Sequence, residues 1–379
     1  MHRRILYKLT SILSCIFIII CAIEIILNFI FPSHNKYCLW LPCRKAIFKP
    51  YPQVMPGVSG NAVFATNSQG VRGDELTDKQ HIRILAVGGS TTECLYIDQQ
   101  KTWSYILQNN LSSAYGQDVW VGNIGRSGLS TTGNLIELKY LLPQYRKIDL
   151  IIALVGFNDF QSALLNTFIS NSLKSDQEKI GMVFVVRPSP KGRFYENSAL
   201  LRTIYAIINY CSRKNRDVVE DSVGSWYIGA RRASKMAQAT IDTLPDLSAD
   251  LKVFENNVDG MIDLARQRSI RIIFLTQPYI WSKNLTPAEN DLLWFGFAED
   301  KKKYYSTGAL IQGLEKFNSR LREICMRRNV ECIDLASLIP HDTSAFYDDV
   351  HFNGGGCQKV ADIISGCIIG KRIKIPAPL

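Results

Sequence analysis

Apolar runs of very different length alternate with polar segments along this chain, and the longest run lies near the N-terminus. Residues 9–31 are almost entirely apolar, and a helix of that length, at about 1.5 Å per residue, crosses the roughly 30 Å core of a bilayer. Arg3, Arg4 and Lys8 precede the run and place the N-terminus in the cytoplasm. The run is longer than the apolar core of a cleaved signal peptide and has no Ala-x-Ala site, so it predicts an uncleaved single-pass anchor.

Glu24 is the single carboxylate within this apolar run. An ionised group in lipid is costly, so we expect Glu24 to be protonated or to contact a partner helix. Prolines with basic and aromatic residues then predict a stem outside the membrane. The expected organisation is a cytoplasmic tip and anchor at 1–31, a stem at 32–80 and the main folded domain at 81–379, which carries the insertion described below.

Five short apolar runs downstream predict the strands of one sheet. They are Ile82–Val87, Val119–Val121, Asp149–Val155, Ile270–Thr276 and Val330–Leu335. Helical patterns lie between them, at 103–111, 135–142, 253–268 and 311–328. Strands that alternate with helices are typical of a doubly wound α/β domain, so we expect a parallel five-stranded sheet covered by helices on both faces.

The interval 161–251 is too long for one simple crossover between strands. It contains helical stretches at 200–210 and 229–241. We interpret it as an insertion or lid carried on the α/β core. Extra packing helices with no role at a site are the alternative.

Composition narrows the class of protein. The chain is 46% hydrophobic and 21% charged, which suits a sizeable folded core. Its net charge of +10 is a mild bias over 379 residues and is compatible with an anionic membrane surface or an acidic polymer. Neither a zinc-finger spacing nor a long basic-aromatic stretch is present, which argues against nucleic acid binding.

The cysteines and histidines do not form a recognisable metal or disulfide pattern. Ten cysteines are scattered, and small buried thiols are the expected state of most. Cys38 and Cys43 bracket a short loop and could pair in an oxidising compartment. The five histidines show no paired ligand spacing, and no phosphate-binding Gly-Lys-Ser/Thr loop occurs, so we expect no metal and no cofactor.

Polar residues follow the predicted strands where ligands bind in open α/β sheets. Ser90 follows the first strand, Gly128 the second and Asn158 the third, while Asp348 and His351 lie in the loop after the fifth. Each has an ordinary structural interpretation when taken alone, such as a helix cap or a turn. Their joint occurrence at one edge of the sheet instead indicates a catalytic site for acyl transfer.

The chemistry of acyl transfer explains these residue types. A serine hydroxyl is a weak nucleophile, and His351 can remove its proton near neutral pH. Asp348, three residues earlier, can fix the tautomer of His351, and Asp349 is the less well placed alternative acid. The oxyanion donors expected are the amides of Ser90 and Gly128 and the side-chain amide of Asn158.

Three sets of polar residues lie near these candidates in the sequence, and structural roles are the first expectation for each. We expect Asp159 to brace its loop and Thr91, Thr92 and Glu93 to cap the first helical turn. The alternative for these last three residues is that they line the pocket. Arg126 points toward the site opening, where it is solvated or meets an anionic substrate.

The four blocks containing Ser90, Gly128, Asn158 and His351 resemble those of the SGNH (GDSL-type) hydrolases, and Asp348 matches the Asp-x-x-His acid. The resemblance spans about 83–366, leaves the insertion unmatched and implies a flavodoxin-like fold. In one departure, Gly88-Gly89-Ser90 replaces the usual Gly-Asp-Ser. That Asp is not the triad acid, so we expect catalysis to be retained. This departure indicates a branch of the family, and the chain resembles membrane-anchored members from bacterial envelope and polysaccharide contexts.

The resemblance implies a membrane-anchored serine esterase with its catalytic domain in the periplasm or outside the cell. The implied substrate is an O-acyl group, with O-acetyl expected, on an envelope or extracellular glycan. An O-acetyltransferase acting on a polysaccharide is the first alternative, because it needs the same triad, and a lipid esterase is the next. A non-catalytic glycan-binding scaffold is a further class, against which the intact Ser90, Asp348 and His351 argue.

Overall fold

The structure is a computed structural model of the 379-residue chain. It describes residues 2–30, 36–166, 174–188, 198–201, 203–204, 207, 218–220, 224–235, 239–297 and 303–370. The chain divides into two compact units. One combines Met1–Tyr37 with Val186–Asp217, and the other combines Cys38–Val185 with Val218–Leu379.

The first unit contains one long apolar helix, α1 (His2–Ile30). Its segment Thr10–Phe29 has a mean hydropathy of 2.7 and is long and apolar enough to cross a membrane. Within this unit the carboxylate of Glu24 accepts hydrogen bonds from the Ser198 hydroxyl and from the amides of Ala199 and Leu200. The Glu24 carboxylate is therefore hydrogen-bonded within the chain, to residues 198–200, where a helical stretch of the insertion begins.

The second unit is built on the five-stranded parallel sheet that the sequence predicts. Its strands are β3 (Ile82–Gly88), β4 (Val119–Asn123), β5 (Leu150–Leu154), β8 (Arg271–Leu275) and β10 (Glu331–Ile333). Their spatial order is β10-β8-β5-β3-β4, which is the flavodoxin-like order 2-1-3-4-5. Because β4 and β5 flank β3, the chain reverses its direction of travel across the sheet at the carboxyl end of β3.

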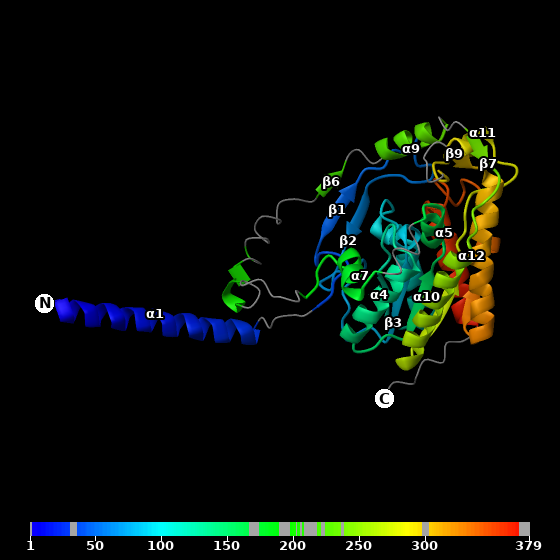
Figure 1. Ribbon diagram of the computed structural model, residues 1–379. Helices are drawn as coiled ribbons and strands as arrows, with labels where there is room; N and C mark the ends of the chain where they lie inside the picture. The colour runs from blue at the N-terminus through cyan, green and yellow to red at the C-terminus, as the bar shows by residue number, and fades with distance from the viewer. Residues whose placement is uncertain are drawn as a thin grey trace. The chain divides into compact units, whose positions relative to one another are not determined.

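Helices cover both faces of this sheet, which explains why β5 is buried along its whole length. On one face α3 (Trp103–Tyr115) packs against α14 (Gly354–Gly370). On the other, α10 (Ser248–Gln267) packs against both α4 (Thr131–Leu141) and α12 (Thr307–Arg328) (Figure 1).

Local sequence defines the ends of the longer helices. Thr102 caps α3 by accepting a hydrogen bond from the amide of Tyr105, and Gly116 ends the helix in the left-handed conformation. Ser306 caps α12 in the same way, and Asn329 ends it with a φ of 48°. Each N-terminal cap pairs an amide that has no partner within its own helix, so both helices can begin close to the rest of the domain.

The compact unit begins at Cys38, so residues 38–80 of the predicted stem pack with the catalytic domain. This region forms β1 (Lys45–Phe48) and β2 (Ala62–Ala65), an antiparallel pair to which β6 (Val218–Glu220) adds in parallel. The buried guanidinium of Arg72 donates to backbone carbonyls on both sides of residue 81, including Val63, Cys94 and Ile97. A buried arginine satisfied by carbonyls ties the segment to residues 94–97, which follow β3 in the chain.

The insertion is more varied than two helices. Its described part contains α7 (Asp176–Val183), β6, α9 (Ser225–Lys235) and β7 (Ala239–Ile241), after α5 (Phe157–Leu164). The predicted helix at 229–241 is wrong at its end, because residues 239–241 pair with β9 (Lys303–Tyr305) as a strand. Within the predicted helix at 200–210, the described residues are helical and the remainder lies outside the described residues.

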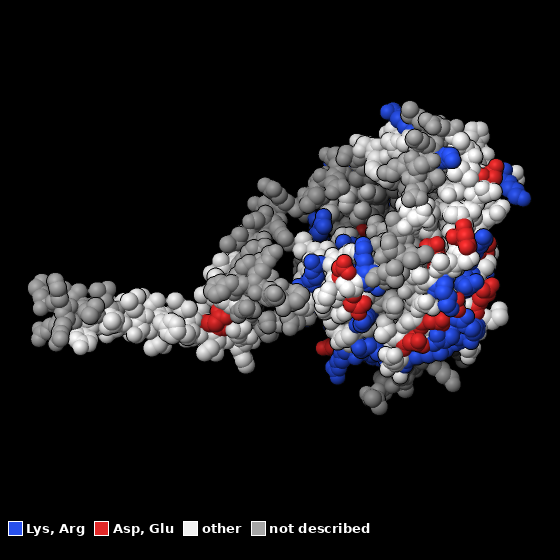
Figure 2. Space-filling model, in the orientation of Figure 1, with Lys and Arg blue, Asp and Glu red and all other residues white. Residues whose placement is uncertain are grey.

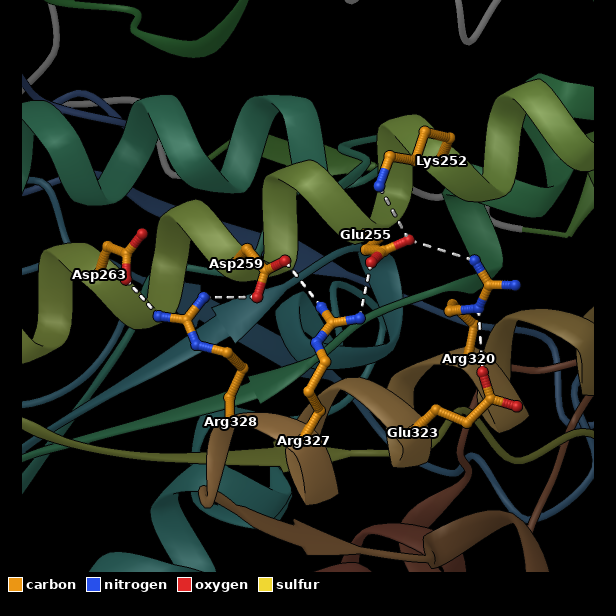
Figure 3. A network of polar contacts seen from close by, with 8 residues as sticks. All are labelled: Lys252, Glu255, Asp259, Asp263, Arg320, Glu323, Arg327 and Arg328. Atoms are coloured by element: carbon orange, nitrogen blue, oxygen red, sulfur yellow. Dashed lines mark hydrogen bonds and ion pairs between the residues drawn. The ribbon is translucent and has the colours of Figure 1, made fainter.

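Ion pairs join α10 to α12 on the surface of the second unit. Acidic side chains of α10 alternate with arginines of α12 along the seam (Figures 2 and 3). The members are Lys252, Glu255, Asp259, Asp263, Arg320, Glu323, Arg327 and Arg328. Glu255, whose side chain is 11% exposed, is the centre of this network because it contacts both Arg320, at 3.3 Å, and Arg327, at 2.7 Å.

We predict that Glu255→Gln lowers the free energy of unfolding at pH 7 by about 1–2 kcal/mol, because two arginines lose a charged acceptor. Burial alone would raise the pKa of Glu255, but hydrogen bonds from Arg327 and Lys252 lower the pKa below its usual value. The stabilisation is therefore present above the unfolded pKa and lost as pH falls through the folded one, so the difference should shrink toward pH 3. Urea unfolding at both pH values measures it.

The matched control is Glu323→Gln, because the Glu323 side chain is 67% exposed and contacts Arg320 alone within this network. We expect it to change the free energy of unfolding by less than about 0.5 kcal/mol. Equal effects of the two substitutions would mean that the seam contributes nothing beyond ordinary surface pairs.

Candidate active site

Ser90 lies at the turn that follows β3, the strand that pairs with both β4 and β5. β3 ends at Gly88, and Ser90 begins the short helix α2 (Ser90–Glu93). Between them, a Cβ on Gly89 would lie 2.1 Å from Nδ2 of Asn158, so only glycine allows this approach. The local sequence therefore brings Ser90 and Asn158 to the same edge of the sheet, at its topological switch point.

His351 reaches Ser90 from a loop more than 250 residues further along the chain. Its Nε2 lies 2.7 Å from Oγ of Ser90, and its Nδ1 lies 2.7 Å from Oδ2 of Asp348. The loop precedes α14, and the His351 ring stacks in parallel on Tyr347 with 5.5 Å between centroids. Serine hydroxyl, imidazole and carboxylate thus form one continuous chain of hydrogen bonds.

Asp348 is fully buried, and four N–H groups point at its carboxylate. Oδ1 accepts from the amides of Val350 and His351, at 3.0 and 2.8 Å. Oδ2 accepts from His351 and from the indole Nε1 of Trp294, at 3.0 Å. Burial alone would raise the pKa of Asp348, but the charge and hydrogen bonds of His351, with the Trp294 bond, lower the pKa below its usual value. Asp348 is therefore a stable anion.

Asp349 points away from His351 and binds a different loop. Its Oδ1 accepts from Nε1 of Trp281 at 2.8 Å, and its Oδ2 accepts from the amides of Trp294 and Phe295. Burial and the neighbouring charge of Asp348 raise the pKa of Asp349 to about 7. Of the two adjacent acids, Asp348 contacts the histidine, and Asp349 holds the segment that carries Trp294.

The opposing effects on His351 favour its charged form. Burial alone would lower its pKa, whereas the charge of Asp348 and the hydrogen bond to it raise the pKa above the usual 6.5. Asp348 also accepts from Nδ1, which leaves Nε2 of the neutral ring free to accept from the Ser90 hydroxyl. The arrangement can thus take a proton from serine and stabilise the imidazolium that results.

The predicted oxyanion donors share one cavity with this chain of hydrogen bonds. Ser90, Gly128, Asn158 and His351 all line a cavity of about 330 Å³. Gly128 has a φ of +78°, a left-handed conformation that suits glycine. One hydrogen of the Asn158 amide is used by the Leu129 carbonyl at 3.0 Å, which orients this side chain beside Gly89.

Neighbouring polar residues hold the oxyanion loops in place. Glu93 is buried, and its carboxylate accepts from both the amide and the hydroxyl of Ser127, directly before Gly128. Asp159 accepts from the amide and hydroxyl of Thr131, and burial raises the pKa of Asp159 to about 6. Asp159 therefore braces a loop, as expected, whereas Glu93 reaches across to another loop and does more than cap its own turn.

Arg126 is half-buried and has partners within the protein. It donates to the Val183 carbonyl and lies over the ring of Trp40, 5.5 Å from the centroid. It does not line the cavity that contains Ser90. Arg126 is therefore neither freely solvated nor among the residues that line this cavity, and both expectations for it were wrong.

Sequence reasoning missed the aromatic side of the cavity. Trp226 and Tyr227 of α9, together with Tyr96, Trp294 and Tyr347, line it beside Ser90. These residues come from four separate segments and follow no spacing that a sequence pattern could detect. The described residues include no group of three or more His, Cys, Asp or Glu arranged to hold a metal ion.

Comparison with known proteins gives one family match. The model of the GDSL-like Lipase/Acylhydrolase family matches residues 86–359. The chain matches no curated protein.

Several solved structures are similar to this chain. One is a member of the lipolytic protein G-D-S-L family from Veillonella parvula DSM 2008, with 12% identity, a TM-score of 0.41, and coverage of 77% of this chain and 100% of that one. Another is Axe2, an acetylxylan esterase from Geobacillus stearothermophilus, with 12% identity, a TM-score of 0.40, and coverage of 76% and 94%. A third is Est24, a carbohydrate acetylesterase from Sinorhizobium meliloti, with 10% identity, a TM-score of 0.40, and coverage of 76% and 99%.

Proposed function

Since the chain belongs to the GDSL-like lipase/acylhydrolase family, which hydrolyses esters, we propose that Ser90, His351 and Asp348 cleave an O-acyl ester through an acyl-enzyme. The observation that carries this proposal is the unbroken chain from the Ser90 hydroxyl through His351 to Asp348, with both links at 2.7 Å. An ionised acid, a neutral base and a hydroxyl in this order are what serine catalysis requires.

In the first half of the reaction, Oγ of Ser90 attacks the ester carbonyl carbon while Nε2 of His351 takes the hydroxyl proton. Asp348 holds Nδ1–H and stabilises the imidazolium. The carbonyl oxygen becomes an oxyanion, for which the amides of Ser90 and Gly128 and the side chain of Asn158 are the proposed donors. The intermediate collapses when His351 returns its proton to the leaving alcohol oxygen.

In the second half, water replaces the alcohol. His351 removes a proton from water as its oxygen attacks the acyl carbon, and the second tetrahedral intermediate collapses when His351 protonates Oγ of Ser90. The net reaction converts one ester and one water into one carboxylic acid and one alcohol. Transfer of the acyl group to a sugar hydroxyl would follow the same path with the sugar in place of water.

The cavity supports a short acyl group, and we propose O-acetyl on an envelope or extracellular glycan as the substrate. Leu95 is the one aliphatic side chain among the described residues that line the cavity, and its other apolar lining consists of aromatic rings, which favours a sugar ester over a fatty acyl ester. A volume of about 330 Å³ is at the small end for ligand pockets, and it suits an acetyl group with part of its alcohol.

We also propose that α1 anchors the enzyme in a membrane through residues 9–31, with its N-terminus in the cytoplasm and the catalytic unit in the periplasm or outside. Support comes from the apolar segment Thr10–Phe29, which at about 1.5 Å per residue matches the roughly 30 Å hydrocarbon core. The basic residues before it favour this orientation. The hydrogen bonds to Glu24 reduce the cost of a carboxylate within the apolar helix.

Ser90→Ala should abolish hydrolysis of a chromogenic acetyl ester without changing the melting temperature, because it removes the nucleophile alone. Mass spectrometry of an acetylated glycan treated with the wild-type enzyme should show losses of about 42 Da, the mass difference for each acetyl group replaced by hydrogen. Retention of more than a few per cent of turnover by the variant would refute the nucleophile. Acetyl gain on an added sugar would identify a transferase.

Substitutions of the two adjacent acids, Asp348 and Asp349, should differ in their effect on turnover. Asp348→Asn should lower kcat by about 10²–10⁴, because the amide presents the wrong partner to Nδ1 of His351. It should also shift the acidic limb of kcat/KM to lower pH. In the wild type this limb is expected above the usual range of histidine, since the Asp348 charge raises the pKa of His351 and only the neutral ring accepts the Ser90 proton. The shift of this limb distinguishes a triad acid from a structural residue.

Asp349→Asn is the matched control and should stay within about tenfold of wild-type turnover, with the acidic limb moved less. The effect of Asp348→Asn should be largely absent in a Ser90→Ala background, because residues that act as one unit are not additive. A greater loss of turnover from Asp349→Asn would require reassignment of the triad acid.

Full-length protein should sediment with membranes and resist alkaline extraction, because an apolar helix of this length partitions into lipid. Protease added on the outer side should digest the catalytic unit and leave a fragment containing α1. A soluble mature form that lacks the N-terminal residues would show that α1 is a cleaved signal sequence.

A further inference from the structure

An aromatic wall forms one side of the cavity that contains Ser90. We define it as Tyr96, Trp226, Tyr227, Trp294 and Tyr347. Its rings meet edge to face: the centroids of Trp226 and Trp294 are 4.8 Å apart at 74°, and those of Trp226 and Tyr227 are 4.9 Å apart at 89°. Tyr227 continues the contact to Tyr347 at 5.9 Å. Such geometry is favourable for aromatic pairs and gives a continuous apolar surface.

Trp226 is the exposed member of this wall. Its side chain is 58% exposed, whereas Tyr227 beside it is buried. A tryptophan side chain offers a large apolar area for a ligand to bury, and this one is open to solvent in the cavity that contains Ser90. Trp226 is therefore the surface of the wall that remains for a substrate to contact.

The wall is held in place by Arg231, one turn further along α9. This buried guanidinium donates through Nε to the Leu292 carbonyl at 2.9 Å, through Nη1 to Val54 at 2.7 Å and through Nη2 to Tyr347 at 3.2 Å. The bonds connect α9 with the segment before Trp294 and with the loop of Asp348 and His351. A side chain bonded to three segments makes α9 a preorganised part of the site.

Polar groups accompany the wall in the same cavity. Ser127 and Gln161 line it together with the aromatic rings. A pyranose ring presents flat faces of C–H groups and a rim of hydroxyls, so it matches an aromatic surface with hydrogen-bonding groups beside it. An acyl chain would instead be served by aliphatic side chains, of which Leu95 is the one present among the described lining residues.

We propose that Trp226 is a binding platform on which a sugar ring of the ester substrate stacks while its acyl group reaches Ser90. The inference rests on the proposed ester hydrolysis and names the residue that binds the alcohol side of the substrate. The insertion then contributes directly to recognition, since it supplies α9 and with it Trp226.

The test compares two acetyl esters that differ in their alcohol. Glucose pentaacetate presents a sugar ring, and vinyl acetate presents none. With Trp226→Ala in the full-length protein, kcat/KM for glucose pentaacetate should fall about tenfold or more, whereas that for vinyl acetate should stay within about twofold. Trp226→Phe should retain most of the activity on the sugar ester, because it keeps a flat aromatic ring.

Ile228→Ala is the matched control on the same helix. Ile228 is 37% exposed and lines a different cavity, so its truncation should change neither reaction. Trp294 is a poorer probe, because its indole N–H also donates to Asp348 and its substitution would alter the triad as well.

Three outcomes would overturn the platform. Equal loss on both esters would mean that Trp226 supports the triad and binds no ring. No loss on either would mean that the ring does not stack there. A larger loss on vinyl laurate than on glucose pentaacetate would assign the wall to the acyl chain.

Calorimetric titration of glucose pentaacetate into Ser90→Ala, with and without Trp226→Ala, tests the platform independently of turnover. Weaker binding by at least about tenfold in the double variant is expected, and equal binding would overturn the inference. Absence of wild-type turnover on every ester would refute the proposed hydrolysis and leave this binding result to be judged separately.

Discussion

The buried carboxylate of Asp348 is the constraint on which this site depends. A buried anion is tolerated only when its charge is met by hydrogen bonds, and Asp348 receives four. Two of them fold the loop back on itself at Val350 and His351, one sets the His351 ring, and one fixes Trp294. Local loop shape, imidazole orientation and one end of the aromatic wall therefore depend on the same two oxygen atoms.

The adjacent Asp349 has a complementary task, because its side chain faces the other side of the same bent loop. While Asp348 faces His351, Asp349 faces the segment around Trp294 and accepts from Trp281, Trp294 and Phe295. The charge of Asp348 is stabilised by His351, whereas Asp349 accepts from the neutral N–H groups of Trp281, Trp294 and Phe295. Burial and the neighbouring charge of Asp348 raise the pKa of Asp349 to about 7. The surroundings of these two identical side chains therefore shift their pKa values in opposite directions.

The periodicity of the chain was sufficient to predict the five strands, their parallel arrangement and the alternation with helices, because burial on both faces produces continuous apolar runs. The residues at the strand ends were also predictable, since parallel strands place their carboxyl ends at one edge. The placement of Ser90, Asn158 and His351 in one cavity was predictable in this way, and three-residue spacing favoured Asp348 over Asp349 as the partner of His351. Local patterns also gave the apolar helix α1.

Tertiary structure decided what depends on contacts between distant segments. Packing of residues 38–80 into the catalytic unit follows from the buried Arg72, whose carbonyl partners cannot be recognised from sequence. Pairing with β9 made residues 239–241 a strand where helical periodicity had predicted a helix. The aromatic wall brings Trp226 to Trp294 from 68 positions along the chain, held by Arg231 through backbone carbonyls that every residue carries. Sequence determines such sites only through the fold, because carbonyls and ring edges leave no pattern of their own.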